Sequence, residues 1–397
     1  MPSESPRHEA LVCEVRERRE RLTEIMKSRG LDSLMVASEA NAFYLTGYET
    51  TLWGNKSKPF AVIFAPPERP KVVCHVGEQV SVELDAIDVD VHPYTGPVDV
   101  GAGAGVQLDY HLPAAETVAA VLAATDVLTV GIEDSWHFMP GFTPRALERL
   151  TSGFAGTVLD GSPAIWQARR CKSTWEIEQM RLAAGAAELT HALFAAAARV
   201  GQTERELNRL LRRCAHDAGA ERVGYSGIIA GVDRAPLGGP TDRRWERGQL
   251  LFVDICLQLN GGYFADFNRI YANATPTADQ RRGYEVIVEA LRRGSDEVRA
   301  GAPVGAVADA IIGDTTTVYA RVGHGLGLEM PEPPSLSPLD PTPLAAGEVI
   351  CVEPNLHVDG VGWLVSEEEV VVTTEGHERI SPPFPRELEV IGGDQRG

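Results

Sequence analysis

The 397-residue sequence has no apolar run of about 18 residues, no CxxC cysteine pair and no excess of basic residues. Without a long apolar run we expect no membrane-spanning helix. Residues 1–22 are charged and contain no apolar stretch, which argues against a signal peptide. The net charge of −19 argues against non-specific binding to nucleic acids or anionic membranes, because such binding requires basic patches. We therefore expect a soluble, cytoplasmic protein.

The cysteines are few and scattered, so they predict neither a disulfide framework nor a zinc finger. Reduced thiols are expected at all six positions: Cys13, Cys74, Cys171, Cys214, Cys256 and Cys351. The apolar content of 44% and charged content of 23% are typical of globular proteins. A chain of this length favours two domains over a single core.

Residues 1–165 alternate between helical and strand-like segments, which predicts an α/β N-terminal domain. A helix is expected over 11–29 and a buried strand over 31–38, whereas 41–48 is expected to form a short strand or turn. Residues 161–173 are expected to be a connector. Further short strands or turns are predicted at 59–65, 71–76 and 127–133, and a helix is predicted at 114–124.

Residues 166–397 have a different character and predict an α+β domain in which helices surround an antiparallel sheet. An Ala-rich helix is expected from Thr174. Thr203 and Glu206 form a capping-box signature at the start of the next helix. Two more helices are expected, over 277–299 and 303–312. Two β-hairpins, at 249–272 and 348–374, complete the domain, with a glycine-rich segment at 322–330 between them.

The second hairpin is expected to bring two glutamates together. If its loop comprises residues 359–361, Val358 pairs with Gly362, and the same register places Glu353 opposite Glu367. Opposed residues of antiparallel strands share a face, and two like charges there repel unless a cation lies between them. Glu369 shares this face, whereas Glu368 points away from it.

The first hairpin carries Asp254 and Asp266, which are an even number of residues apart. They share a face only if the loop has an odd length or contains a bulge, as a three-residue loop at 260–262 would provide. Asp266 then opposes Cys256, with Asp254 diagonal to it. A two-residue Asn-Gly loop would instead place the aspartates on opposite faces.

Four such carboxylates and the histidine of a Gly-His-Gly segment, His324, suit a site for two divalent metal ions. A set of oxygen ligands with one imidazole favours Mn²⁺, Fe²⁺ or Co²⁺ over Zn²⁺. Two metals can activate a water molecule and polarise a scissile carbonyl. The alternative is that each acid is a solvated surface residue. Asp254 and Glu353 lie within apolar segments, however, and buried acids need a partner.

These segments resemble, in order, those of the creatinase/aminopeptidase P family, the M24 metallopeptidases of pita-bread fold. The resemblance covers nearly the whole chain. It rests on LDSLMVASEANAFYLTGY, RRCKSTWEIEQMRLAA, GPTDRRWERGQLLFVDI, GGYFADFNRIY, GHGLGLEMPEPP, VICVEPNLHV and VSEEEVVVTTEG.

The resemblance implies five metal ligands, which are Asp254, Asp266, His324, Glu353 and Glu367. It implies that Asp266 and Glu367 bridge the two metals and that Glu353 also assists proton transfer. It further implies a homodimer acting on a small-molecule or short-peptide substrate. In such a dimer the partner's N-terminal domain edges the active site, and Tyr44 and Trp53 are candidates for that edge. Both are otherwise expected to be buried aromatic residues.

The sequence departs from the family pattern at several positions. Leu237 and Pro331 stand where the family's peptidases have histidines that bind substrate and handle the proton sent to the leaving amine. Asn268 replaces a serine or threonine, and the spacing of the two aspartates is one residue longer. Glu329, Glu332 and His357 are candidates for a substitute acid/base group, and each is otherwise expected to be structural or exposed. The candidates for the substrate pocket are Leu237, Pro331, Cys256, His357 and Trp53.

The predicted function is a metal-dependent hydrolase that cleaves a C–N bond in a small substrate, as Xaa-Pro peptidases do. A specialised enzyme on the same fold is the alternative, either a lyase or a creatinase-like amidinohydrolase. A non-catalytic binding protein is a third possibility.

Overall fold

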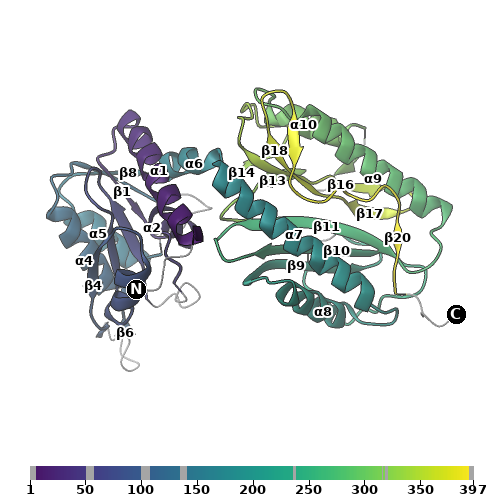
Figure 1. The fold of residues 1–397 in the computed structure, drawn as a ribbon, viewed down its shortest axis with the longest axis horizontal. Helices are drawn as coiled ribbons and strands as arrows, with labels where there is room; N and C mark the ends of the chain where they lie inside the picture. The colour runs from purple at the N-terminus through teal and green to yellow at the C-terminus, as the bar shows by residue number, and fades with distance from the viewer. Residues whose placement is uncertain are drawn as a thin grey trace. The chain divides into compact units, whose positions relative to one another are not determined.

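The computed structural model separates into two compact units, Met1–Arg169 and Arg170–Gly397 (Figure 1). The residues that the structure describes are 6–50, 58–99, 108–134, 141–235, 238–314, 316–317 and 321–392. Among their helices, none combines the length and apolarity needed to cross a bilayer.

The first unit is built on a mixed sheet in which β1 pairs antiparallel with β2 and parallel with β7. Its strand order is β4-β3-β2-β1-β7-β8. These strands are β1 (Ser33–Val36), β2 (Ala61–Phe64), β3 (Lys71–His75), β4 (Asp90–Tyr94), β7 (Thr129–Ile132) and β8 (Thr157–Asp160), and β5 (Val98–Asp99) pairs separately with β6 (Leu108–Asp109). The helices are α1 (Pro6–Ser28), α2 (Glu39–Thr46), η2 (Val76–Glu78), α3 (Gln79–Asp85), α4 (His111–Ala123), α5 (Pro144–Gly153) and α6 (Ser162–Arg170).

One prediction for this part of the chain is wrong. Residues 41–48, expected as a strand or turn, lie mostly in α2, which ends at Gly47 in the left-handed conformation. All of its residues from Ala40 to Thr46 are buried, so the segment lacks the polar face that identifies an amphipathic helix. The expected connector at 161–173 contains the boundary between the two units, and most of it is helical, as α6. Pro163 is compatible with this helix because it occupies the first turn, where proline is tolerated.

The second unit contains two larger sheets, with strand orders β20-β11-β10-β9 and β14-β13-β15-β18-β19, and a smaller one, β12-β16-β17. The strands are β9 (Arg222–Ala230), β10 (Leu251–Gln258), β11 (Phe264–Ala272), β12 (Thr316–Thr317), β13 (Gly323–Gly325), β14 (Glu332–Ser335), β15 (Val349–Val352), β16 (Asn355–Val358), β17 (Gly362–Val365), β18 (Glu368–Val372), β19 (His377–Arg379) and β20 (Glu389–Val390). The helices are α7 (Thr174–Ala197), α8 (Glu204–Asp217), α9 (Ala278–Glu297) and α10 (Val304–Ile312).

Helices cover the outer faces of these sheets, as Figure 1 shows. Helices α7 and α8 pack against β9, β10 and β11, whereas α9 packs against β15, β16 and β17. The main core of the unit lies between α9, α10 and the sheet of β13, β15 and β18. Strands β11 and β18 approach each other, so the two sheets meet at the strands that carry the acidic residues.

Both predicted hairpin registers are confirmed. In the first, Cys256 pairs with Asp266 and Asp254 with Asn268, across an odd turn of residues 259–263. The turn is longer than the expected three residues because regular pairing ends at Gln258 and Phe264. In the second hairpin Val358 pairs with Gly362.

The second hairpin differs from expectation in one respect, because its ladder is divided. Strands β15 and β18 form one part, and β16 and β17 form the other. Pro354 lies at the break, where its missing N–H cannot contribute to a continuous ladder. Glu353 and Glu367 lie in this gap, outside the regular strands.

Gly294 allows α9 and α10 to pack closely. A Cβ atom added there would lie 2.9 Å from Ile311 Cδ1 and closer still to Ile311 Cγ1. We expect Gly294→Ala to lower the free energy of unfolding by about 1–3 kcal/mol, because overpacking outweighs the gain in helix propensity. Urea denaturation followed by circular dichroism measures the change.

Gly185 in α7 provides the matched control, since nothing lies within 4 Å of a Cβ atom added there. Gly185→Ala should be neutral or should stabilise the protein by up to about 1 kcal/mol. Equal effects of the two substitutions would contradict the packing argument.

Candidate metal centre

The five predicted site residues come from five places in the second unit. Asp254 lies on β10, Asp266 on β11 and His324 on β13, while Glu353 follows β15 and Glu367 precedes β18. The imidazole Nε2 of His324 lies 3.6 Å from Asp266 Oδ2, 3.8 Å from Glu367 Oε1 and 4.0 Å from Glu353 Oε2. Oxygens of three carboxylates thus surround the Nε2 atom of a buried imidazole.

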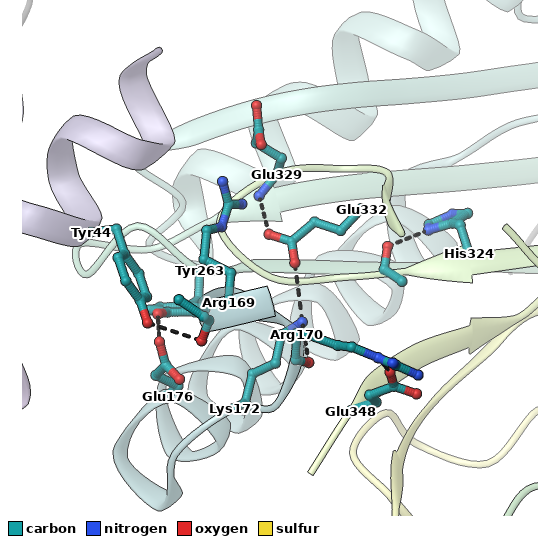
Figure 2. Close-up of polar contacts among 12 residues, drawn as sticks. Tyr44, Arg169, Arg170, Lys172, Glu176, Tyr263, His324, Glu329, Glu332 and Glu348 are labelled. Carbon is teal, nitrogen blue, oxygen red and sulfur yellow. Dashed lines mark hydrogen bonds and ion pairs between the residues drawn. The ribbon is translucent and has the colours of Figure 1, made fainter. Parts of the chain in front are cut away.

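The orientation of His324 is set by its other ring nitrogen. Nδ1 lies 2.9 Å from the carbonyl oxygen of Gly325, so a proton on Nδ1 donates to that oxygen (Figure 2). Burial, reinforced by the charge of Arg321, lowers the pKa of His324 to about 4. At neutral pH the imidazole is therefore uncharged and presents the Nε2 lone pair to the carboxylates, as a metal ligand does.

Asp254 joins the cluster electrostatically. Burial, then the charge of Glu353, raises its pKa to about 8. Burial also raises the pKa of Asp266 well above its usual range, with Asp254 as the next cause. The pKa of Glu353 is raised to about 7 by burial, against which the positive charge of Arg321 acts. Asp254 and Asp266 therefore hold protons at neutral pH unless a cation replaces them, and Glu353 is partly protonated there.

The donor atoms fit a divalent metal ion. Asp254 Oδ1 and Glu367 Oε1 are buried and have no hydrogen-bond partner. Buried acceptors of this kind require a partner that supplies positive charge or a proton. Carboxylate oxygens with one imidazole nitrogen suit hard or borderline cations such as Mn²⁺ and Fe²⁺.

Cys351 is a neighbour that the sequence did not single out. One ligand atom each of Cys351, Asp266, His324 and Glu367 lies within 4.8 Å of the others. Burial raises the pKa of the Cys351 thiol well above its usual range, and the adjacent carboxylates raise it further. Because a thiol coordinates metals as the thiolate, the oxygens and the imidazole form the better donor set.

Glu369 contacts the backbone of one of the site residues, Asp266. Its Oε1 accepts a hydrogen bond from the backbone N–H of Asp266. The predicted register of the second hairpin already places Glu369 on the same face as Glu367, so the sequence alone could have identified Glu369 as a neighbour of the site. Glu368 instead accepts hydrogen bonds from Arg379 Nε and the Phe384 backbone N–H, as its opposite orientation predicts. No sequence pattern pointed to Arg321, whose charge influences the pKa values of the cluster.

The loop after His324 is held by a buried ion pair (Figure 2). Lys172 Nζ lies 3.0 Å from Glu332 Oε2, and the two side chains are 3% and 2% exposed. Glu332 Oε1 also accepts the backbone N–H of Glu329. A Cβ atom added at Gly327 would lie 2.6 Å from the Glu332 carboxylate. The pair therefore fixes the loop that contains Pro331 and makes proton transfer by Glu332 unfavourable.

The other candidates have varied surroundings. Cys256 is buried directly opposite Asp266. His357 is 41% exposed and its Nδ1 lies 3.7 Å from Asp359. Tyr44 is buried within the first unit, where its hydroxyl donates to the Ala168 carbonyl. Leu237 and Trp53 lie outside the described residues.

Comparisons with known proteins cover both units. The profile of Metallopeptidase family M24 matches residues 178–375, and the Creatinase/Prolidase N-terminal domain matches residues 18–171. An uncharacterized peptidase of Staphylococcus aureus strain MSSA476 is 26% identical over 367 residues, which are 89% of this chain and 95% of the relative.

Solved structures share the fold at low sequence identity. A recombinant prolidase from Thermococcus sibiricus has a TM-score of 0.80 at 22% identity, covering 95% of this chain and 98% of that one. An X-Pro aminopeptidase from Thermotoga maritima has a TM-score of 0.78 at 21% identity, covering 94% and 99%. Together with the profiles, these similarities extend over the acidic cluster and both of its hairpins.

Without metal, the free energy of unfolding should fall as the pH rises from about 4 to about 8. The pKa values of Asp254 and Glu353, about 8 and about 7 in the folded state, exceed those of an unfolded chain, about 4. The stabilisation is complete below about pH 4. It is lost between about pH 4 and the folded-state pKa of each group, at about 1.4 kcal/mol per pH unit for each proton that only the folded protein retains. Urea denaturation in excess chelator measures this slope.

Divalent metal should flatten the slope, because metal binding favours the ionised carboxylates. Glu353→Gln should reduce the slope in chelator, since it removes one titrating group. A metal-free protein whose stability rises over this pH range would contradict the assignment.

Removing one partner of the Lys172–Glu332 pair should destabilise the protein by about 3–5 kcal/mol, because the remaining charge is buried without compensation. Lys172→Met and Glu332→Gln test each partner, and the double variant should be more stable than either single variant. The exposed pair Arg181–Glu378 is the control, where Glu378→Gln should cost at most about 1 kcal/mol. Additive single effects at Lys172 and Glu332 would rule out the coupling.

Proposed function

The chain belongs to metallopeptidase family M24, a family of hydrolases that depend on two metal ions, and on this premise we propose that Asp254, Asp266, His324, Glu353 and Glu367 hold those ions. One observation carries the proposal: His324 Nε2 faces the carboxylates of Asp266, Glu353 and Glu367 at 3.6–4.0 Å. The unpartnered oxygens of Asp254 and Glu367 support it.

The metal pair, when bound, supplies a water molecule of lowered pKa and polarises the scissile carbonyl. The protein's own residues divide the remaining work. Glu353 has the most exposed side chain of the three carboxylates around His324, at 21%. An ionised carboxylate that substrate can reach can accept a proton from the attacking water and pass it to the leaving amine. His324 stays neutral and fixes the position of the carboxylates.

We propose a short peptide or related small amide as the substrate, cleaved at a C–N bond. The fold neighbours named above are an X-Pro aminopeptidase and a prolidase, which supports testing bonds that precede proline first. Leu237 and Pro331 stand in place of the family's histidines and have no titratable group, so we assign proton transfer to the leaving amine to Glu353 alone. Within the described residues, no feature favours elimination, amidine hydrolysis or a non-catalytic role.

We further propose Mn²⁺, Fe²⁺ or Co²⁺ as the bound metal in preference to Zn²⁺, because carboxylates dominate the donor set. A homodimer in the cytoplasm is also proposed. The free state of all six cysteines is consistent with a reducing compartment. Light scattering on the purified protein would give the oligomeric state.

Chelator-treated protein should lose hydrolysis of Ala-Pro and other Xaa-Pro dipeptides, and Mn²⁺ or Co²⁺ should restore it. Glu353→Gln and Asp266→Asn should each lower kcat/KM by at least about 100-fold, because they remove proton transfer and a ligand. Chromatographic detection of released proline measures the rate.

The control is Asp359→Asn, in the exposed turn of the second hairpin, which should leave the rate unchanged. Wild-type rates in both Glu353→Gln and Asp266→Asn would show that this mechanism is wrong. A peptide panel without proline would reveal a different specificity if proline is not released.

A further inference from the structure

Asn268 is a buried residue at the metal centre that the five-residue set leaves out. It lies on β11 two residues after Asp266 and directly opposite Asp254 on β10. Its amide therefore shares the face of both aspartates. The residue is 0% exposed, so its polar atoms have no access to bulk solvent.

The two ends of this amide have different surroundings. Nδ2 lies 3.2 Å from Glu367 Oε2 and donates to it. This orientation is required when a bound metal keeps Glu367 ionised, because an ionised carboxylate only accepts hydrogen bonds. The other end, Oδ1, is buried and has no hydrogen-bond partner.

The unpartnered oxygen is one of several at this place. Asp254 Oδ1 and Glu367 Oε1 are likewise buried without a partner. Asp254 is the cross-strand neighbour of Asn268, and Glu367 is its hydrogen-bond acceptor. Three acceptor atoms from three residues in contact thus lack a donor, and a divalent cation can satisfy all of them together.

We propose that Asn268 is a further metal-site residue, which offers Oδ1 as a neutral ligand on the side of Asp254 while its Nδ2 holds Glu367. This inference rests on the metal site of the proposed function. A side-chain amide oxygen is a hard donor that releases no proton on binding, and it favours Mn²⁺ over Zn²⁺. It also reaches further from the strand than the serine or threonine of related sequences.

Calorimetric titration of chelator-treated, full-length protein with MnCl₂ tests the proposal. The wild-type protein should bind two equivalents. Asn268→Leu keeps the branched shape of the side chain but removes both functions, and it should weaken the lower-affinity site by about 10–100-fold. Asn268→Thr, the more conservative variant, should lose less affinity and guards against a folding defect.

Asn273 provides the matched control. Its side chain is buried like that of Asn268, at 4% exposed. Unlike Asn268, it has a hydrogen-bond partner for each amide atom: Oδ1 accepts from the Gly248 N–H and Nδ2 donates to the Glu246 carbonyl. Asn273→Leu should leave both manganese affinities within about twofold of wild type, whatever it does to stability.

A crystal structure of the Mn²⁺-loaded wild-type protein, with anomalous scattering to locate the ions, separates the two functions of the amide. Direct contact between Oδ1 and an ion is the expected result. Lost affinity without that contact would overturn the ligand role and leave a positioning role for Nδ2. Unchanged affinity in Asn268→Leu and Asn268→Thr would overturn both. A wild-type protein that binds no Mn²⁺ would instead overturn the metal site itself.

Discussion

Mutual repulsion among buried carboxylates is the constraint on which the second unit depends. The hairpin registers place Asp254 and Asp266 on one face and Glu353 opposite Glu367, and the approach of β11 to β18 brings the two pairs together. In a site closed to solvent such charges are costly, and their raised pKa values express that cost. A bound cation converts the same repulsion into affinity, which is why the acids can be retained.

The surroundings of the cluster hold its parts in place without neutralising it. The Gly325 carbonyl orients His324, and the carboxylate of Glu369 accepts the backbone N–H of Asp266. Arg321 is a positive charge that lowers the pKa values of Asp266 and Glu353. The ion pair of Lys172 and Glu332 fixes the loop after His324, although Lys172 is distant in sequence from that loop and from the acids. Rigid supports of this kind keep ligands pre-positioned for a metal ion.

The departures from the family pattern include Pro331, at a position where the family's histidine binds substrate, and Asn268, which lies beside the proposed metal ligands. Pro331 lies in the loop that Lys172 and Glu332 fix, so the position of the missing histidine is rigidly defined. Asn268, by contrast, lies among the metal-site acids, and its amide replaces a hydroxyl. The chain thus combines the proposed metal centre with two altered neighbours, Pro331 in the loop after His324 and Asn268 among the acids.

The sequence by itself determined the parity of both hairpins, because alternation along a strand is a local rule that residue numbers can express. It therefore selected Glu367 over Glu368 and required an odd turn after Asp254. Only the tertiary structure decided which sheets meet, and so brought His324, Cys351 and Arg321 to the acids and Lys172 to Glu332. It also decided that 41–46 is helical, since burial on all sides removes the periodicity that identifies a helix. Contacts between distant segments depend on packing, which no local pattern records.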